Sequence, residues 1–151
     1  MRSPLGPITL LVSERGARAV SFGDVPGPDG ARKARTETAQ LEVELREYFA
    51  GRRREFSVPL DAHGTRFQEK VWRALCTVPY GKTATYADIA RKVGSPRAFR
   101  AVGGANRCNP LAIVVPCHRI IGADGSMTGY GGPSGIPLKV RLLALESASQ
   151  A

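Results

Sequence analysis

The sequence predicts an α/β protein in which a small N-terminal unit, a strand hairpin plus a helix, packs on a mainly helical C-terminal domain with a helix-turn-helix. Two short apolar runs flank a turn near the N-terminus, a helical apolar stripe follows them, and helix-start signals mark the second half. We place the N-terminal domain at residues 1–62 and the C-terminal domain at residues 63–151.

Two apolar runs predict the hairpin. Residues 8–12 and 17–22 have strand character and are joined by a turn at residues 14–16. Residues 56–60 predict a short edge strand at the end of the same domain, before a linker at residues 61–64.

One helix is expected between these strands, over residues 37–50, with Gly51 as its stop signal. Its apolar side is formed by Leu41, Leu45, Tyr48 and Phe49. The three arginines at residues 52–54 are either a phosphate-binding patch or a solvated run of charge.

Two capping boxes predict helix starts in the C-terminal domain. Thr65 and Gln68 open one helix, and Thr85 and Asp88 open a second. In each pair the hydroxyl and the longer polar side chain can satisfy backbone N–H groups that have no partner within the helix.

A third helix is expected directly after the second. Gly94 ends the earlier helix, Ser95 caps the new one and Pro96 takes its first position. Two short helices joined in this way have the dimensions of a helix-turn-helix, although a generic helical corner has the same spacing.

The third helix combines basic side chains with small ones. These residues are Arg97, Arg100, Arg107, Ala101, Gly103 and Gly104. Small residues allow close approach of another backbone, which is either nucleic acid or a neighbouring helix.

The last helix supplies a carboxylate. We expect it to start at Pro137, with Leu138, Leu142, Leu143 and Leu145 on its apolar side. Glu146 shares the face of Leu142, where desolvation and the helix dipole both disfavour it. It therefore needs a hydrogen-bond donor unless it reaches solvent, as most glutamates do.

The strongest chemical signal follows residues 111–115, an apolar and β-branched run that predicts a buried strand. Cys117 and His118 come next, and they are typical of a nucleophile and its base, in direct contact or through one water. Arg119 could also favour the thiolate, and Glu146 would complete a Cys–His–Glu series. The alternative is an inert buried cysteine, which is how we interpret the other two cysteines.

Length and composition exclude several classes of protein. The 151 residues suffice for one domain or two small ones, and 42% hydrophobic with 23% charged residues is ordinary for a folded chain. No apolar run approaches the ~18 residues that a membrane helix needs. The first residues have no signal-peptide pattern, so we expect a cytoplasmic protein. Three cysteines without metal-ligand spacing indicate free thiols rather than a disulfide scaffold.

The net charge indicates the kind of partner. Twenty-two Lys and Arg against thirteen Asp and Glu leave a formal charge of +9, which favours a polyanion, usually nucleic acid. Most of these basic residues are arginines, which suit phosphate contacts, although a GC-rich genome produces the same bias.

The four residues from Pro116 to Arg119, after an Asn-Pro pair and an apolar run, resemble the active-site signature of the O6-alkylguanine-DNA alkyltransferases, or methylated-DNA–protein-cysteine methyltransferases. The resemblance is specific over residues 67–147 and weaker before them. Further motifs in family order are at residues 79–83, 85–90, 101–105, 109–110, 129–132 and 139–146.

The resemblance implies roles for individual residues. Cys117 would be the acceptor thiolate, with His118 as its water-bridged base held by Glu146. Asn109 would brace the turn before the active site. Tyr86 would assist rotation of the target nucleotide and donate a proton toward N3 of the departing guanine.

The resemblance also implies how DNA and guanine are held. The wall of the guanine pocket would be Tyr130, with the amide of Gly131 near O6 and Arg119 nearby. The backbone carbonyls of Cys117 and Ile120 would accept from the guanine amine. Arg100 would enter the base stack in place of the extruded nucleotide, and the other DNA contacts would come from Tyr86, Arg97, Ala101, Gly103, Gly104 and Arg107.

The expected function is direct reversal of DNA damage by a monomer that acts on double-stranded DNA containing O6-alkylguanine, with no cofactor, metal or membrane. One alternative is an alkyltransferase-like protein that binds lesions without transfer; such proteins characteristically lack the acceptor cysteine. A second is a cysteine hydrolase unrelated to DNA. Two departures from the family pattern are Cys108, where many members have Gly, and a longer segment at residues 133–137.

Overall fold

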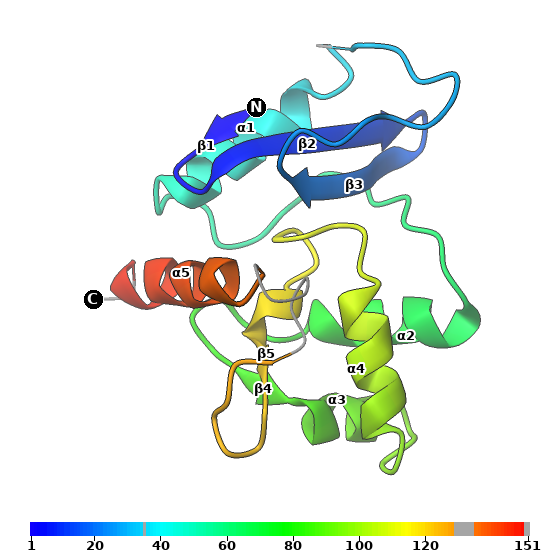
Figure 1. Cartoon of the computed structure of the whole chain (residues 1–151), viewed down its shortest axis with the longest axis vertical. Helices are drawn as coiled ribbons and strands as arrows, with labels where there is room; N and C mark the ends of the chain where they lie inside the picture. Colours follow the sequence, from blue (N-terminus) through cyan, green and yellow to red (C-terminus); the bar gives the residue numbers. More distant parts are fainter. Residues whose placement is uncertain (35, 129–134, 150–151) are drawn as a thin grey trace. The chain divides into compact units, whose positions relative to one another are not determined.

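The computed structural model describes residues 1–34, 36–128 and 135–149. The predicted α/β class is confirmed: a strand hairpin with a helix is followed by a mainly helical second part (Figure 1). None of the helices in the described ranges has the length and apolar character needed to cross a membrane.

The chain divides into two compact units. Unit 1 contains residues 1–63 and 110–114, and unit 2 contains residues 64–109 and 115–151. The single boundary expected between residues 62 and 63 does not anticipate residues 110–114, which belong to unit 1 because their backbone bonds to its sheet.

Unit 1 contains a three-stranded antiparallel sheet. Its strands are β1 (Arg2–Ser3), β2 (Gly6–Ser13) and β3 (Gly16–Phe22), in that order. The predicted hairpin of β2 and β3 is confirmed. The turn requires a glycine at Gly16, where φ is +147° and a Cβ would overlap the carbonyl oxygen of Pro59.

Among the described residues of unit 1, one segment is helical, α1 (Ala39–Phe49). Leu41, Leu45 and Tyr48 are buried, as their helical spacing predicts. Glu44 is buried on the same helix with only 2% of its surface exposed, which the sequence did not indicate.

The Glu44 carboxylate explains why the expected edge strand at residues 56–60 is wrong. It accepts from the backbone N–H of Ser57 at 2.7 Å and of Val58 at 3.2 Å, so these donors are not available to a strand ladder. Within residues 56–60, Leu60 alone pairs, in one bridge to Ala17 of β3.

The apolar run at residues 111–115 is buried, but the expected strand is wrong. Leu111 forms a single parallel bridge with Val20 of β3, and the Ala112 N–H donates to the Val20 carbonyl at 3.3 Å. Ile113 then has a φ of +72°, so the backbone turns instead of continuing. A β-branched run predicts the burial of side chains better than it predicts backbone pairing.

Unit 2 is mainly helical. Its elements are α2 (Arg66–Leu75), β4 (Ala84–Thr85), α3 (Tyr86–Lys92), α4 (Phe99–Arg107), the 3₁₀ turn η1 (Cys117–Arg119), β5 (Ile120–Ile121) and α5 (Gly135–Ala148). Both predicted capping boxes are confirmed, Thr65 with Gln68 at α2 and Thr85 with Asp88 at α3. The parallel pairing of β4 with β5 brings the start of α3 beside the chain that leaves η1.

The corner between α3 and α4 has a different turn from the one expected. Gly94 has a φ of +78°, as a helix stop requires. The predicted cap at Ser95 and helix start at Pro96 are wrong, because the Ala98 N–H donates to the Ser95 carbonyl at 2.9 Å and closes a separate turn. α4 begins at Phe99, so Arg97 lies before the helix.

The last helix, α5, begins at Gly135, so Pro137 lies in its first turn rather than at its start. Its buried residues are Gly135, Lys139, Leu142 and Glu146. Of the expected apolar side, Leu142 is buried, while the other three leucines are half-buried.

Candidate active site

Cys117 lies at the start of η1 and has 4% of its surface exposed. Two asparagine side chains hold the backbone around it. Asn109 donates to the Val115 carbonyl at 2.9 Å, and Asn106, on the buried side of α4, donates to the Cys117 carbonyl at 3.4 Å. Asn109 thus bridges the turn before Cys117, where the family resemblance puts it. Asn106 was not anticipated.

Burial controls the ionisation of the Cys117 thiol. Loss of solvation raises the pKa of Cys117 to about 11. A hydrogen bond from the Asn109 side chain and the positive charge of Lys139 act in the opposite direction and favour the thiolate. Because a thiol with this pKa is protonated at neutral pH, nucleophilic attack requires a base.

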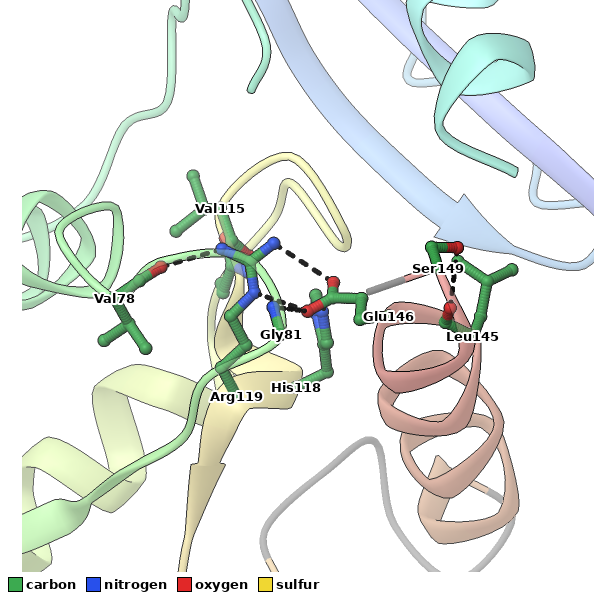
Figure 2. Close-up of polar contacts among 9 residues, drawn as sticks. Val78, Gly81, Val115, His118, Arg119, Leu145, Glu146 and Ser149 are labelled. Carbon is green, nitrogen blue, oxygen red and sulfur yellow. Dashed lines mark hydrogen bonds and ion pairs between the residues drawn. The ribbon is translucent and has the colours of Figure 1, made fainter. Parts of the chain in front are cut away.

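Glu146 connects three segments of unit 2 through its carboxylate (Figure 2). It accepts from His118 Nε2 at 2.6 Å and from two guanidinium nitrogens of Arg119 at 2.9 and 3.1 Å. The Gly81 N–H adds a bond at 3.1 Å. The side chains of Glu146 and His118 are fully buried, so the predicted pairing of these two residues is confirmed and a solvated Glu146 is wrong.

His118 has the protonation state of a base. Burial lowers the pKa of His118, and the hydrogen bond to Glu146 offsets only part of that effect. Because a carboxylate only accepts, Nε2 carries the ring hydrogen and Nδ1 keeps a lone pair. Within the described ranges, Nδ1 is buried and has no hydrogen-bond partner. Direct contact with the Cys117 thiol, one of the two expected arrangements, is therefore not the arrangement found.

Arg119 supports Glu146. Besides its two bonds to this carboxylate, the guanidinium donates to the Val78 carbonyl at 2.8 Å and lies 5.6 Å from the centre of the Tyr80 ring. The sequence predicts that Arg119 favours the thiolate, and the family resemblance places it by the substrate pocket. Its donors are directed at Glu146 and Val78 instead, so we reassign it to the buried ion pair.

Lys139 is the cation that acts on Cys117. It is fully buried on α5, and its Nζ donates to the carbonyls of Ile120 and Thr128, the latter at 2.9 Å. Burial lowers the pKa of Lys139 to about 8, and the neighbouring Cys117 opposes this shift. The sequence predicts no role for Lys139. Its position seven residues before Glu146, on the same helix face, was the available signal.

A second cluster of site residues lies on the outside of unit 2. It forms a surface hollow of about 370 Å³ lined by Tyr86, Phe99, Arg100, Gly103, Arg107 and Thr128. The Tyr86 hydroxyl donates to the Thr128 carbonyl at 2.9 Å. Thr128 therefore accepts from Lys139 and from Tyr86, which links the buried and exposed clusters within this unit.

The small residues of α4 have different surroundings, some packed against a neighbouring helix and some open. A Cβ at Gly103 would lie 3.8 Å from the Tyr86 ring, so this glycine packs against α3. At Gly104 nothing described lies within 4 Å of such an atom, so its surface is open. Ala101 is exposed. Arg100 and Arg107 on α4, and Arg97 just before it, are exposed as well.

The comparisons with known proteins cover both units. Residues 66–148 match the 6-O-methylguanine DNA methyltransferase, DNA binding domain, and residues 1–62 match the ribonuclease-like domain of the same enzyme. The chain belongs to the 6-O-methylguanine DNA methyltransferase family. The resemblance read from the residues around Cys117 is thereby confirmed.

Named relatives in this methyltransferase family are similar to the chain in sequence over most of its length. A methylated-DNA–protein-cysteine methyltransferase of Methanosarcina barkeri is 44% identical, with 97% of this chain and 94% of that protein covered. One of Mycolicibacterium paratuberculosis is 48% identical over 95% of this chain and 88% of that protein. The crystal structure of Mycobacterium tuberculosis OGT in complex with DNA is 44% identical with a TM-score of 0.92, covering 99% of this chain and 91% of that one.

Part of the expected guanine pocket falls on residues that the structure does not describe. Tyr130 and Gly131 lie outside the described residues, as do residues 133 and 134 of the longer segment at 133–137; residues 135–137 belong to α5. The other two cysteines, Cys76 and Cys108, are exposed, so their interpretation as buried residues is wrong.

Proposed function

We propose that this chain repairs DNA by direct damage reversal, moving the alkyl group from O6 of an alkylated guanine in double-stranded DNA to Sγ of Cys117. The observation that carries the proposal is the buried hydrogen-bonded pair of His118 and Glu146 beside a buried cysteine, in the same unit as an exposed basic helix. The protein acts as a monomer, in the cytoplasm, where thiols remain reduced, and needs no cofactor.

The transfer is an in-line displacement at carbon. A bond forms between Sγ of Cys117 and the alkyl carbon, and the bond between this carbon and O6 breaks. The electron pair leaves with the guanine, which becomes neutral when the Tyr86 hydroxyl donates a proton toward N3. The product is a thioether that water does not cleave readily, so each molecule acts once.

Removal of the thiol proton is the step that the buried cluster assists. Since Nε2 of His118 is bonded to Glu146, the lone pair on Nδ1 is the one that receives the proton, through one bridging water. Glu146 stabilises the imidazolium that forms. Arg119 keeps Glu146 oriented, and Lys139 favours the thiolate.

The target atom is buried in duplex DNA, so the nucleotide must be extruded at a cost of a few kcal/mol. Arg100 enters the space it leaves. Tyr86 must release the Thr128 carbonyl before it can donate to the guanine. The extruded base then lies against Tyr130 and Gly131 and donates its amine to the carbonyls of Cys117 and Ile120. Arg97, Ala101, Gly103, Gly104 and Arg107 contact the DNA around it.

The two alternatives differ in what happens to the alkyl group. A lesion-binding protein would hold the damaged DNA without transfer, and a cysteine hydrolase would ignore it. The presence of Cys117 and the names of the relatives argue against the first. The charge of +9 and the exposed arginines of α4 argue against the second.

Incubation with duplex DNA that carries a radiolabelled O6-methyl group separates the three functions. Label on the protein is the expected result. Tight binding with the label still on DNA would replace our proposal with lesion binding, and neither binding nor transfer would leave the hydrolase. A Cys117→Ser variant should retain DNA binding and take no label.

A further inference from the structure

Phe99 is an apolar residue in an unusual place. It is the first residue of α4 and has 49% of its surface exposed. The apolar residues that follow it on the helix, Val102 and Ala105, are buried, with 0% and 3% of their surface exposed. The only other large apolar residue of unit 2 that is this exposed among the described residues is Val140 on α5.

Phe99 lies in a surface hollow whose lining includes two arginines. It shares the 370 Å³ hollow with Arg100 and Arg107, and with Gly103, which has no side chain to fill the space. Phe99, Gly103 and Arg107 are four residues apart, so they lie along one face of α4. Arg100 is the neighbour of Phe99 in sequence.

We propose that Phe99 is a DNA-contacting residue that inserts as an apolar wedge beside Arg100, against the bases and sugars that flank the extruded nucleotide. This inference rests on the proposed function. Proteins that open or kink DNA often place Phe, Leu or Met between base steps, because an apolar side chain covers the base faces exposed by unstacking. Arg107, on the same face of α4, attracts a phosphate, while the Phe99 ring covers apolar base and sugar surface next to the space that Arg100 enters.

A wedge has a signature that differs from a phosphate contact. An uncharged side chain releases no counterions, so its loss weakens binding without changing the slope of log K against log salt. The loss of Arg107, by contrast, should reduce the magnitude of this slope by about 0.9. Phe99 should also matter on duplex DNA and not on a free alkylated base, which needs no opening.

The test compares Phe99→Ala, Phe99→Leu and the control Val140→Ala with wild type. Affinity for duplex DNA is measured by fluorescence anisotropy at several salt concentrations. Transfer rates are measured on O6-methylguanine duplex and on free O6-benzylguanine, with thermal unfolding as a check of folding. We expect Phe99→Ala to lose roughly tenfold in affinity and in duplex rate, the scale of one aromatic–base contact.

The salt slope, the free-base rate and the other two variants distinguish a wedge from a general loss of function. Phe99→Ala should keep the wild-type salt slope and free-base rate, Phe99→Leu should retain most of the duplex activity as a smaller wedge, and Val140→Ala should behave as wild type. Unchanged affinity and duplex rate in Phe99→Ala would overturn the proposal, as would an equal loss on the free base. If wild type itself transfers no alkyl group, the proposed function fails instead, whatever the anisotropy shows.

Discussion

The side chains around Glu146 are almost closed to solvent, whereas those on the outer face of α4 are open to it. In the first group, Glu146 and His118 are fully buried and each polar group depends on its neighbour. In the second, Arg100 and Arg107 are exposed and contact solvent independently. Charges in a buried cluster cannot be removed singly without leaving another charge unpaired, while distant surface contacts contribute separately.

This contrast assigns different tasks to the two regions. The buried cluster fixes where protons lie around Cys117, so it controls the chemistry of the thiol. The exposed face of α4 controls how DNA is held and opened. Substitutions in the first region should therefore affect reactions with any alkyl donor, and substitutions in the second should affect duplex DNA above all.

The largest effect should follow from Glu146→Gln. The Arg119 guanidinium would remain buried without a counter-charge, which costs about 3–5 kcal/mol. For a chain of this length the melting temperature should fall by roughly 6–20 °C. Transfer should slow on both DNA and free base, by more than DNA affinity falls. Thermal unfolding, transfer rates and anisotropy measure these three quantities.

A matched control is available in unit 1. Glu42 and Arg46 on α1 form an exposed ion pair at 2.7 Å, with 35% and 57% of their side chains exposed. Glu42→Gln should therefore cost less than ~1 kcal/mol and leave transfer unchanged. Equal losses of stability in the two variants would mean that burial does not distinguish the two ion pairs.

The next effect in size should come from Arg100→Ala. If Arg100 offsets the few kcal/mol that nucleotide extrusion costs, duplex transfer should slow by about 100-fold. Transfer from free O6-benzylguanine should slow much less. Both rates are measured on one preparation whose folding is checked by circular dichroism. Equal losses on the two substrates would assign Arg100 to the fold or the guanine pocket.

A smaller effect is expected on the pH dependence of thiol reactivity. Because burial raises the pKa of Cys117 to about 11, alkylation by a small reagent should accelerate as pH rises toward that value. His118→Ala removes the group that receives the thiol proton, so the reaction profile should move to higher pH. Lys139, whose pKa is lowered to about 8, loses its favourable charge above that pH in both proteins. If the pH profile of alkylation is the same in His118→Ala as in wild type, His118 is not the base.

The smallest effect should be that of Arg107→Ala. Loss of one phosphate contact should weaken binding to all duplex sequences alike and reduce the salt slope by about 0.9. Anisotropy titrations at several salt concentrations provide the slope, and competition between unrelated sequences tests uniformity. A preference for particular sequences that vanishes in the variant would indicate base contact instead.

Local signals predicted helix starts well in this chain. The capping boxes at Thr65 and Thr85 were found because both partners lie within three residues. The start of α4 was missed because the Ser95 carbonyl could equally close a turn with Ala98, a choice that the residues themselves do not decide. The strand expected over 111–115 failed because pairing depends on a distant partner, β3.

The predictability of the site also depends on how far apart in the sequence the interacting residues lie. Glu146 was identified because a carboxylate on the apolar face of a helix requires a donor. Lys139 on the same face was overlooked because lysine is usually exposed. What holds it in place is a pair of backbone carbonyls, at Ile120 and Thr128, and carbonyls have no sequence signature.

The central claim, that Cys117 accepts the alkyl group once and permanently, is tested most directly by the intact mass of the protein after reaction with excess O6-methylguanine DNA. We predict the addition of one methyl group, located by peptide mapping on Cys117 and absent from Cys117→Ser. Exposed Cys76 and Cys108 in the same chain serve as internal controls. An unchanged mass, an adduct on either of these cysteines, or sustained turnover of DNA beyond one equivalent would contradict the account.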